Sequence, residues 1–378
     1  MKKVVRIILT AVAAIVMAAI ASALFVWGGE IRTLCSLERV GDNPYLYQME
    51  YYAPYDLDDV IVNDIDSNQK LLNYIVSRIT KGIPVSGLNV DTNAGGFGCT
   101  SFQARNAEGE GYLFGRNYDF FKNPTLVTVS RPKDGYASVA CSDMSHFGYG
   151  LEKLPDSFKT KILSLASIYA PVDGMNEKGL CTSIMALPNQ AACQQTGKHP
   201  VGTSIIMRLF LDRCATVQEA LDLVASYDIR HDAKVGSGYH YMVADASGAC
   251  AVIEFDKNDG WKTMIVEKPK EMNHMLVTNH LLSPKYYTTE PDPEVGNPHS
   301  RSWWRYETAG GYLAAHDGVL TSDQAQECLA LVHWKDLVWD NGTVEDTQFS
   351  NVYDQQALTL SLRSWYDYDT TCVFSLAR

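Results

Sequence analysis

The stretch GCTSFQARN at residues 98–106 is followed closely by GYLFGRNYDF at residues 111–120. The first has the composition of a strand, residues 107–110 read as a turn, and residues 111–116 read as the returning strand, which together predict a β-hairpin that begins at Cys99. The returning strand brings Arg116 and Asp119 back towards Cys99. The sequence therefore predicts a thiol, a guanidinium and a carboxylate at one end of the hairpin.

These three side chains have a direct chemical use. The thiolate is the reactive form of cysteine, and a neighbouring cation lowers the thiol pKa below its usual value of about 8.5. A carboxylate beside it can hold a cationic or hydrogen-bonding partner. An ordinary strand cysteine beside a surface Arg–Asp pair gives the same spacing, so spacing alone leaves both interpretations open.

The rest of the chain predicts a sheet-rich α+β protein with helices on the outer faces. Helical spacing or capping patterns occur at four places, including a Thr216–Glu219 capping box. The expected helices cover residues 68–79, 204–214, 216–226 and 321–333. The further expected strands cover residues 126–130, 180–185, 239–244, 249–255, 275–278 and 358–362.

The N-terminus has the pattern of a targeting segment. Lys2, Lys3 and Arg6 precede an uncharged, mostly apolar stretch at residues 7–27, and about 20 such residues suffice to cross a membrane. Ala21-Ser-Ala23 has the small-x-small form that signal peptidase cleaves. The sequence therefore predicts an exported protein, either secreted or anchored to the membrane, and leaves anchor and cleaved signal open.

The chain divides into three parts by composition. Residues 1–28 are the expected signal peptide or anchor, residues 29–98 are a segment that ends in the glycine-rich loop DTNAGGFG (91–98), and residues 99–378 form the main domain. Glycine tolerates backbone angles that other residues do not, so the loop is suited to be flexible, strained or both.

Composition excludes several classes of function. The net charge is −12 and no basic run follows the first six residues, whereas a nucleic-acid binder needs clustered Lys and Arg. The nine cysteines form no CxxC pair and no HExxH motif occurs, so we expect neither a metal site nor a cofactor. Disulfide pairing and oligomeric state, a homo-oligomer included, stay open.

The hairpin motifs resemble those of a known group. Cys-Thr-Ser followed by Gly-Arg-Asn-x-Asp, whose arginine lies seventeen residues after the cysteine, is similar to the cysteine N-terminal-nucleophile hydrolases of the choloylglycine hydrolase group. That group includes bile salt hydrolases, penicillin V acylases, acid ceramidase and N-acylethanolamine acid amidase. The later segments that resemble the group are DGMNEKGL (173–180), VTN (277–279), SWWRY (302–306) and FSNVYD (349–354).

The resemblance implies a fold and a mechanism. The fold is an αββα sandwich of two mainly antiparallel sheets between helical layers, and the activity is hydrolysis of a linear, non-peptide amide C–N bond in a small molecule. Cys99 attacks the carbonyl with its own α-amine as the base, so no histidine is required. Arg116 favours the thiolate and Asp119 orients the α-amine. Asn279 stabilises the oxyanion.

Two more arginines and one alanine concern the same site. Arg305 is implied to support the charges around the nucleophile, with Arg301 as a rival for that position. Bile salt hydrolases usually carry an asparagine where this chain has Ala186, which removes a second oxyanion donor and argues against a standard bile salt substrate. Acylated amines, acylated amino acids and penicillin V-like compounds stay as candidates.

The resemblance implies that residues 29–98 are a prosegment ending in a glycine-rich cleavage loop and that residues 99–378 are the hydrolase domain. A prosegment this long is a second departure from many bacterial relatives. Because 98 residues precede Cys99, its α-amine must be freed by cleavage between Gly98 and Cys99. The resemblance to the ceramidase-like relatives implies autocleavage, in which the thiol attacks the Gly98 carbonyl. Two alternatives remain: a cysteine dipeptidase with the same nucleophile, and a non-catalytic exported binding protein on this fold.

We predict that Cys99→Ala abolishes turnover of amide substrates and that Cys99→Ser abolishes or sharply reduces it, because neither variant has the thiol. The measurement is product release from a panel of conjugated bile salts, N-acyl amino acids, N-acylethanolamines and penicillin V. Turnover by Cys99→Ala at the rate of the unmodified protein would contradict the assignment of the nucleophile.

Overall fold

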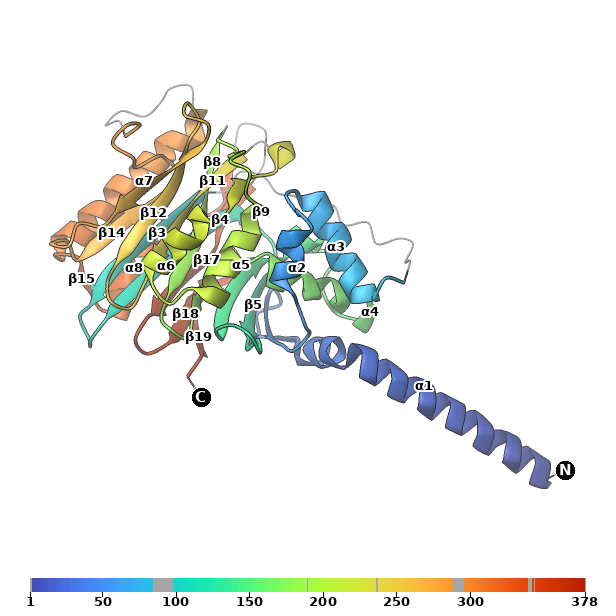
Figure 1. The fold of residues 1–378 in the computed structure, drawn as a ribbon. Coiled ribbons are helices and arrows are strands. Elements are labelled where there is room, and N and C mark those ends of the chain that lie inside the picture. The colour runs from blue at the N-terminus through green and yellow to red at the C-terminus, as the bar shows by residue number, and fades with distance from the viewer. Residues whose placement is uncertain are drawn as a thin grey trace.

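Two stacked β-sheets lie between layers of helices in the computed structural model of the chain (Figure 1). The structure describes residues 2–83, 98–188, 190–235, 237–287, 296–338, 342 and 344–377. Apolar side chains from the facing sides of both sheets form the main core. This arrangement confirms the predicted α+β sandwich.

The first sheet carries the predicted hairpin. In the described part of the chain its strand order is β14-β3-β4-β17-β18-β19, with β15 paired to β3 and β16 paired to β17. All these pairings are antiparallel except β15 with β3. The strands are β3 (Gly98–Asn106), β4 (Tyr112–Phe121), β14 (His274–Val277), β15 (Val319–Leu320), β16 (Leu337–Val338), β17 (Val344–Asp354), β18 (Thr359–Ser364) and β19 (Asp367–Ser375).

The second sheet begins with strands that precede the hairpin. Its order among the described residues is β1-β2-β5-β6-β7-β8-β11-β12-β13. Strand β2 is parallel to β5, whereas β1 with β2 and β5 with β6 are antiparallel. The strands are β1 (Glu38–Arg39), β2 (Leu46–Tyr51), β5 (Thr125–Ser130), β6 (Ser138–Asp143), β7 (Asp173–Asn176), β8 (Cys181–Pro188), β11 (Ser237–Ala244), β12 (Cys250–Asp256) and β13 (Lys262–Glu267). A separate parallel pair joins β9 (Pro200–Gly202) to β10 (Asp228–Arg230).

Helices cover the outer faces of both sheets. Helices α7 and α8 pack on β3, β4, β14 and β17, whereas α5 and α6 pack on β7, β8, β11 and β12. Their bounds are α5 (Thr203–Arg213), α6 (Val217–Ala225), α7 (Gly296–Ala315) and α8 (Ser322–Leu331). The remaining helices are α1 (Lys2–Ser36), α2 (Leu57–Val62), α3 (Asn68–Thr80), α4 (Phe158–Lys161) and the 3₁₀ segments η1 (Met144–Phe147), η2 (Ile162–Tyr169) and η3 (Ala233–Val235).

Most predicted elements occur within a few residues of their expected bounds. The returning strand of the hairpin is longer than predicted and reaches Phe121, because β17 pairs with it from Leu113 to Phe121. The expected capping box at α6 is only half formed: Thr216 accepts a hydrogen bond from the backbone of Glu219, but the Glu219 carboxylate accepts one from Ala215.

Helix α7 is the largest element that the sequence did not predict. It contains the SWWRY motif at residues 302–306. Two adjacent glycines, Gly310 and Gly311, interrupt its sequence, and glycine normally argues against a helix interior. Pro298 stands in the first turn, where proline is tolerated. Packing of Leu313 and Ala309 in the core under this helix overrides that local preference.

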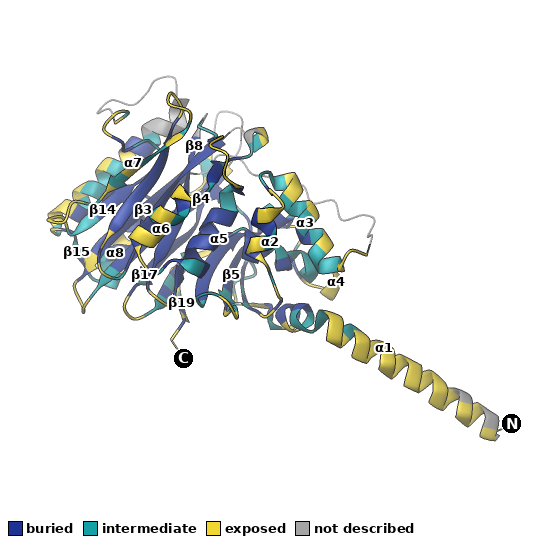
Figure 2. Cartoon of the chain, viewed as in Figure 1, coloured by how far each residue is buried: buried dark blue, intermediate teal, exposed yellow. Residues whose placement is uncertain are grey.

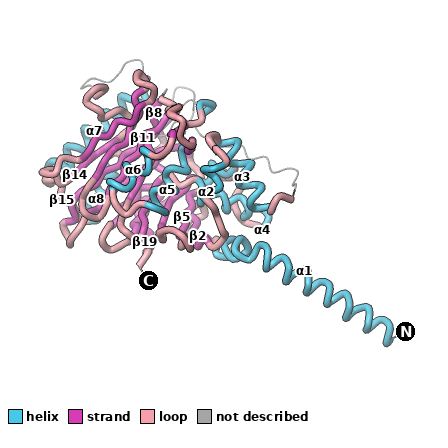
Figure 3. Tube along the Cα trace, viewed as in Figure 1, coloured by secondary structure: helices cyan, strands magenta, loops and turns pink. Residues whose placement is uncertain are grey.

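The N-terminal helix α1 projects from the two-sheet body (Figures 2 and 3). Its apolar part is largely exposed, and the segment Val5–Ser36 is long and apolar enough to cross a membrane. A bend at Trp27 separates this part from the last turns, where Thr33 and Leu34 are buried against the body. Residues 84–97, which include all of the expected glycine-rich loop except Gly98, lie outside the described part of the chain. Strand β3 begins at Gly98.

We predict that Gly115→Ala destabilises the protein by about 1–3 kcal/mol, the usual effect of overpacking a core. A Cβ atom at Gly115 would lie 2.3 Å from the ring of Phe102, which is fully buried on the neighbouring strand. The measurement is the urea midpoint at unchanged m value. Gly109→Ala is the control, because nothing lies within 4 Å of its Cβ position; equal midpoints for both variants would contradict the prediction.

Candidate active site

The pairing of β3 with β4 places the predicted residues at one end of the hairpin. Gly98 lies opposite Asp119, Cys99 opposite Tyr118, and Ser101 opposite Arg116. Residues directly opposite each other in an antiparallel pair share one face of the sheet, and successive residues alternate between faces. Cys99 and Arg116 therefore share the face towards the second sheet, while Asp119 lies on the other face beside Gly98.

The thiol and the guanidinium converge on one carbonyl. The Cys99 thiol donates to the carbonyl oxygen of Ile184 on β8 at 3.7 Å, and Arg116 Nη2 donates to the same oxygen at 2.7 Å. Arg116 Nε also lies 3.6 Å from Asp173 Oδ2. Cys99, Arg116 and Asp173 are all fully buried between the two sheets.

Asn279 and Arg305 hold the backbone of Cys99. Asn279 follows β14, which is paired with β3, and its side-chain oxygen accepts from the Cys99 backbone N–H at 2.7 Å and from Arg305 Nη2 at 2.8 Å. Arg305 Nη1 on α7 donates to the Cys99 carbonyl and, at 3.1 Å, to Thr100 Oγ1. Arg305 therefore makes the contact that the sequence left between it and Arg301.

The orientation of the Asn279 amide differs from the expected one. Its NH₂ group donates to the carbonyl of Ala186 at 2.8 Å, and its oxygen faces Cys99. While Gly98 and Cys99 are consecutive residues of β3, the NH₂ group of Asn279 is therefore already hydrogen-bonded within the protein. Ala186 contributes its backbone carbonyl to the site, and its side chain has no donor.

Only one of the two carboxylate oxygens of Asp119 accepts a hydrogen bond from the described residues. Its Oδ1 accepts from Thr347 Oγ1 on β17 at 2.6 Å. Its Oδ2 accepts no hydrogen bond from the described residues and lies 3.9 Å from Arg305 Nη1. The same Oδ2 is 3.0 Å from the position of a Cβ atom on Gly98, so the carboxylate faces the residue that precedes the nucleophile.

Burial dominates the acid–base properties of the site. Desolvation raises the pKa of the Cys99 thiol to about 11, against the lowering effect of Arg116 and Arg305. Desolvation also raises the pKa of Asp119, against Arg305 and Thr347, and lowers the pKa of Arg305. The Asp173 pKa is raised to about 6 by burial, with Arg116 acting in the opposite direction. Cys99 is therefore a protonated thiol at neutral pH in this form of the chain.

The structure brings together all five residues that the sequence singled out, namely Cys99, Arg116, Asp119, Asn279 and Arg305. Sequence reasoning gave no role to three further residues around them. Asp173 begins the DGMNEKGL segment and could have been found there, because it is a buried partner for Arg116. Thr347 and Trp334 come from β17 and the segment after α8, and no sequence pattern indicated either of them.

Among the described residues no group of three or more His, Cys, Asp or Glu side chains is placed to hold a metal ion. The two histidines with the most apolar flanks have structural partners: His240 lies between Glu254 and the Thr278 carbonyl, and the ring of His280 stacks on Trp303.

A buried cysteine at the start of a strand, in one of two stacked sheets between helical layers, is the arrangement of an N-terminal-nucleophile hydrolase fold. Residues 105–362 match the family described as acyl-coenzyme A:6-aminopenicillanic acid acyl-transferase. The chain belongs to this family, and the match covers Arg116, Asp119, Asn279 and Arg305. It begins six residues after Cys99. No curated protein sequence matches the chain.

Solved structures share this fold at low sequence identity. A mutant of the conjugated bile acid hydrolase from Clostridium perfringens has a TM-score of 0.53 and 14% identity, covering 74% of this chain and 92% of its own. A second variant of the same hydrolase has a TM-score of 0.54 and the same identity and coverage. A penicillin V acylase from Agrobacterium tumefaciens has a TM-score of 0.50 and 20% identity, covering 73% of this chain and 85% of its own. These matches confirm the family group that the sequence motifs indicated, together with the expected fold and the expected class of enzyme, an amide hydrolase.

We predict that Thr347→Val shifts the acid limb of the pH–rate profile to higher pH. The Thr347 hydroxyl donates to Asp119 and lowers the pKa of that carboxyl. Without this donor the Asp119 pKa rises, so a smaller fraction of Asp119 is ionised at a given acidic pH. The measurement is the pH dependence of kcat/KM through the acidic and neutral range.

Thr347→Ser is the matched control for this prediction, because it keeps the hydroxyl and is expected to keep the profile of the unmodified protein. A Thr347→Val profile that loses height at every pH without moving would show that Thr347 acts only through packing.

Proposed function

We propose that the protein hydrolyses a linear amide bond of an acylated amine or amino acid, with the Cys99 thiol as the nucleophile after cleavage between Gly98 and Cys99. The observation that carries the proposal is the set of contacts to Cys99: its N–H, its carbonyl and its thiol are held by Asn279, Arg305 and the Ile184 carbonyl, the last shared with Arg116. An ordinary buried cysteine does not need this number of polar and charged partners.

Cleavage is needed because the Cys99 nitrogen is part of a peptide bond in the uncut chain. A peptide nitrogen cannot accept the thiol proton, whereas a free α-amine has a reference pKa of about 7.7 and can do so near neutral pH. Asp119 Oδ2 faces Gly98 without a hydrogen-bond donor among the described residues. After Gly98 is released, this carboxylate is positioned to accept a hydrogen bond from the new amine.

The catalytic steps then use groups that surround Cys99. The α-amine takes the thiol proton, the sulfur attacks the amide carbonyl of the substrate, and the leaving amine receives the proton as the C–N bond breaks. Water activated by the same α-amine hydrolyses the resulting thioester. Arg116 and Arg305 favour the thiolate, since both lower the pKa of the Cys99 thiol.

Oxyanion stabilisation is assigned to Asn279, and it requires a rearrangement. The NH₂ group of Asn279 must exchange the Ala186 carbonyl for the substrate oxyanion. One side-chain donor of this kind typically contributes about 3 kcal/mol to lowering the barrier. Because Ala186 has no side-chain donor, a backbone N–H has to supply any second hydrogen bond.

Self-cleavage is supported by the surroundings of Gly98. A Cβ atom at this position would lie 2.5 Å from the Trp334 ring, so the chain approaches Trp334 at a distance that only glycine permits. In the proposed reaction the Cys99 thiol attacks the Gly98 carbonyl, the acyl group moves from nitrogen to sulfur, and water hydrolyses the thioester. This releases Cys99 with a free α-amine.

The alternatives differ in what they require. A cysteine dipeptidase would share the Cys99 chemistry but would also need groups that bind the free amine of a peptide. A non-catalytic binding protein would keep the bond between Gly98 and Cys99.

We also propose that the protein is exported, with residues 7–27 as an anchor or a cleaved signal, because this apolar stretch is exposed on α1.

We predict that the purified protein contains a polypeptide whose first residue is Cys99, whereas Cys99→Ala yields only uncut chain. Cys99→Ala lacks the attacking thiol and removes only one heavy atom from the site. The measurement is intact-mass analysis with N-terminal sequencing of both proteins, expressed side by side.

Two outcomes separate the alternatives. Full amidase activity from a preparation that contains only uncut chain would overturn the proposed mechanism. Cleavage of Cys99→Ala at the same bond would show that another protease performs the cut, which would remove the self-cleavage step and leave the nucleophile assignment standing.

A further inference from the structure

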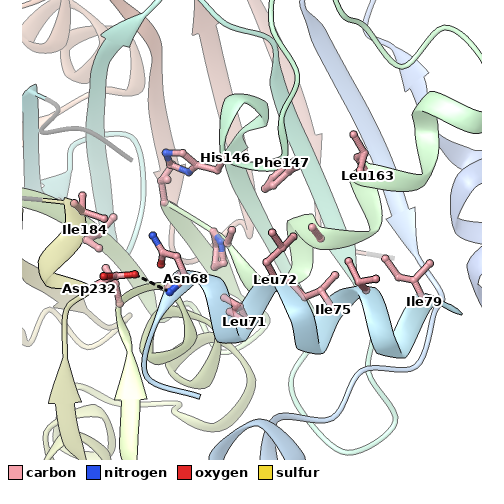
Figure 4. A pocket seen from close by; sticks show the side chains of 18 of the residues that line it. Asn68, Leu71, Leu72, Ile75, Ile79, His146, Phe147, Leu163, Ile184 and Asp232 are labelled. Atoms are coloured by element: carbon pink, nitrogen blue, oxygen red, sulfur yellow. Dashed lines mark hydrogen bonds between the residues drawn. The ribbon is translucent and has the colours of Figure 1, made fainter. Parts of the chain in front are cut away.

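An apolar groove lies between α3 and the segments η1 and η2 (Figure 4). One wall is the face of α3 that carries Leu71, Leu72, Ile75, Val76 and Ile79. The opposite wall is formed by Phe147, Ile162, Leu163 and Ala166. Part of the space between these walls is open to solvent.

The inner end of the groove adjoins the proposed nucleophile. Ile184 lines this end, and its carbonyl is the oxygen that accepts from both the Cys99 thiol and Arg116. Polar groups gather at the same end in Figure 4, where the backbone N–H of Asn68 donates to Asp232 at 3.0 Å. His146 also lines the groove, and its Nε2 has no hydrogen-bond partner among the described residues.

The outer end is apolar and adjoins the N-terminal helix. Ile79 and Leu163 lie at this end, opposite Ile184 in Figure 4. The Trp27 indole donates to the Ile79 carbonyl at 2.9 Å, which joins the bend of α1 to the end of α3. From Asn68 to Thr80, α3 spans about 18 Å at 1.5 Å per residue, so the groove is long as well as apolar.

We propose that this groove binds the straight aliphatic chain of an N-acyl amine, with the scissile amide at the Ile184 end. The proposal rests on the proposed function and names its substrate class. Apolar side chains line the length of both walls, and the hydrogen bond between Asn68 and Asp232 lies at the Ile184 end. This distribution matches a molecule with a long apolar tail and one polar amide.

The groove gives the N-terminal segment a role after cleavage. Helix α3 precedes Gly98, so one wall of the acyl site belongs to the part of the chain that the cut separates from Cys99. Contacts across the cut hold this part in place: β2 pairs with β5 along its whole length, and Tyr51 donates to the Leu165 carbonyl at 2.9 Å. The mature enzyme therefore consists of two associated polypeptides.

The position of α1 fits the same class of substrate. Its exposed apolar stretch ends at Trp27, beside the outer end of the groove. Tryptophan is enriched where a protein meets the membrane surface. A membrane-anchored form would present the outer end of the groove near the bilayer, where long-chain amides partition.

The test compares two tryptophan substitutions on neighbouring residues of α3. Val76 lines the groove, whereas Ser77 is exposed and does not line it. Full-length Val76→Trp and Ser77→Trp are assayed with coumarin amides that carry straight acyl chains from acetyl to palmitoyl. Leu163→Trp, on the opposite wall, is a second groove variant in case Val76→Trp fails to fold.

For the unmodified protein and Ser77→Trp, kcat/KM is expected to rise with chain length, by up to about fourfold for each CH₂ group that the groove buries. The groove variants are expected to lose activity on the palmitoyl amide by at least about tenfold, since filling the groove displaces two or more CH₂ groups. Their loss of activity on the acetyl amide should be much smaller, because an acetyl group does not extend along the groove.

The outcomes distinguish failure of the groove proposal from failure of the proposed function. Cleavage of every amide with no dependence on chain length would overturn the groove and leave the proposed function intact. Cleavage of no amide by a protein that begins at Cys99 would count against the proposed function itself. A mature enzyme that lacks residues 68–80 and still prefers long chains would also overturn the groove proposal.

Discussion

The antiparallel pairing between β3 and β4 is the constraint on which the candidate active site depends. It sets Cys99 opposite Tyr118 and Gly98 opposite Asp119. A shift by one residue would move every side chain of β3 to the opposite face of the sheet. Cys99 would then leave the Ile184 carbonyl and Arg116. The register is held further by β17, which pairs with β4 along most of its length, and by Phe102, whose ring fills the space above Gly115.

The site also concentrates buried charge. Arg116, Asp119, Asp173 and Arg305 are all fully buried, and each ion costs several kcal/mol to remove from water unless partners compensate. Compensation is uneven, because several polar atoms of these side chains have no hydrogen bond among the described residues. A buried network of this kind is a poor way to stabilise a fold. Its arrangement around one cysteine is better explained by chemistry that uses the charges.

Local pattern predicted the hairpin, and with it the approach of Arg116 and Asp119 to Cys99, because a hairpin joins residues that are close in sequence. Asn279 and Arg305 lie far along the chain, so only the resemblance to a known group indicated them. Thr347 could not be found in either way: it reaches Asp119 because β17 pairs with β4. Helix α7 was missed because its two adjacent glycines argue against a helix, while packing against β3 and β14 favours one.

Strands β1 and β2 occupy one edge of the second sheet, next to β5. They belong to the chain before Gly98, so loss of this part after cleavage would uncover the backbone N–H and C=O groups of β5 that now pair with β2. An unpaired strand edge is a template for aggregation with another copy of the protein. The segment before Gly98 therefore covers this strand edge, and its departure after the proposed cleavage would lower the solubility of the remaining domain.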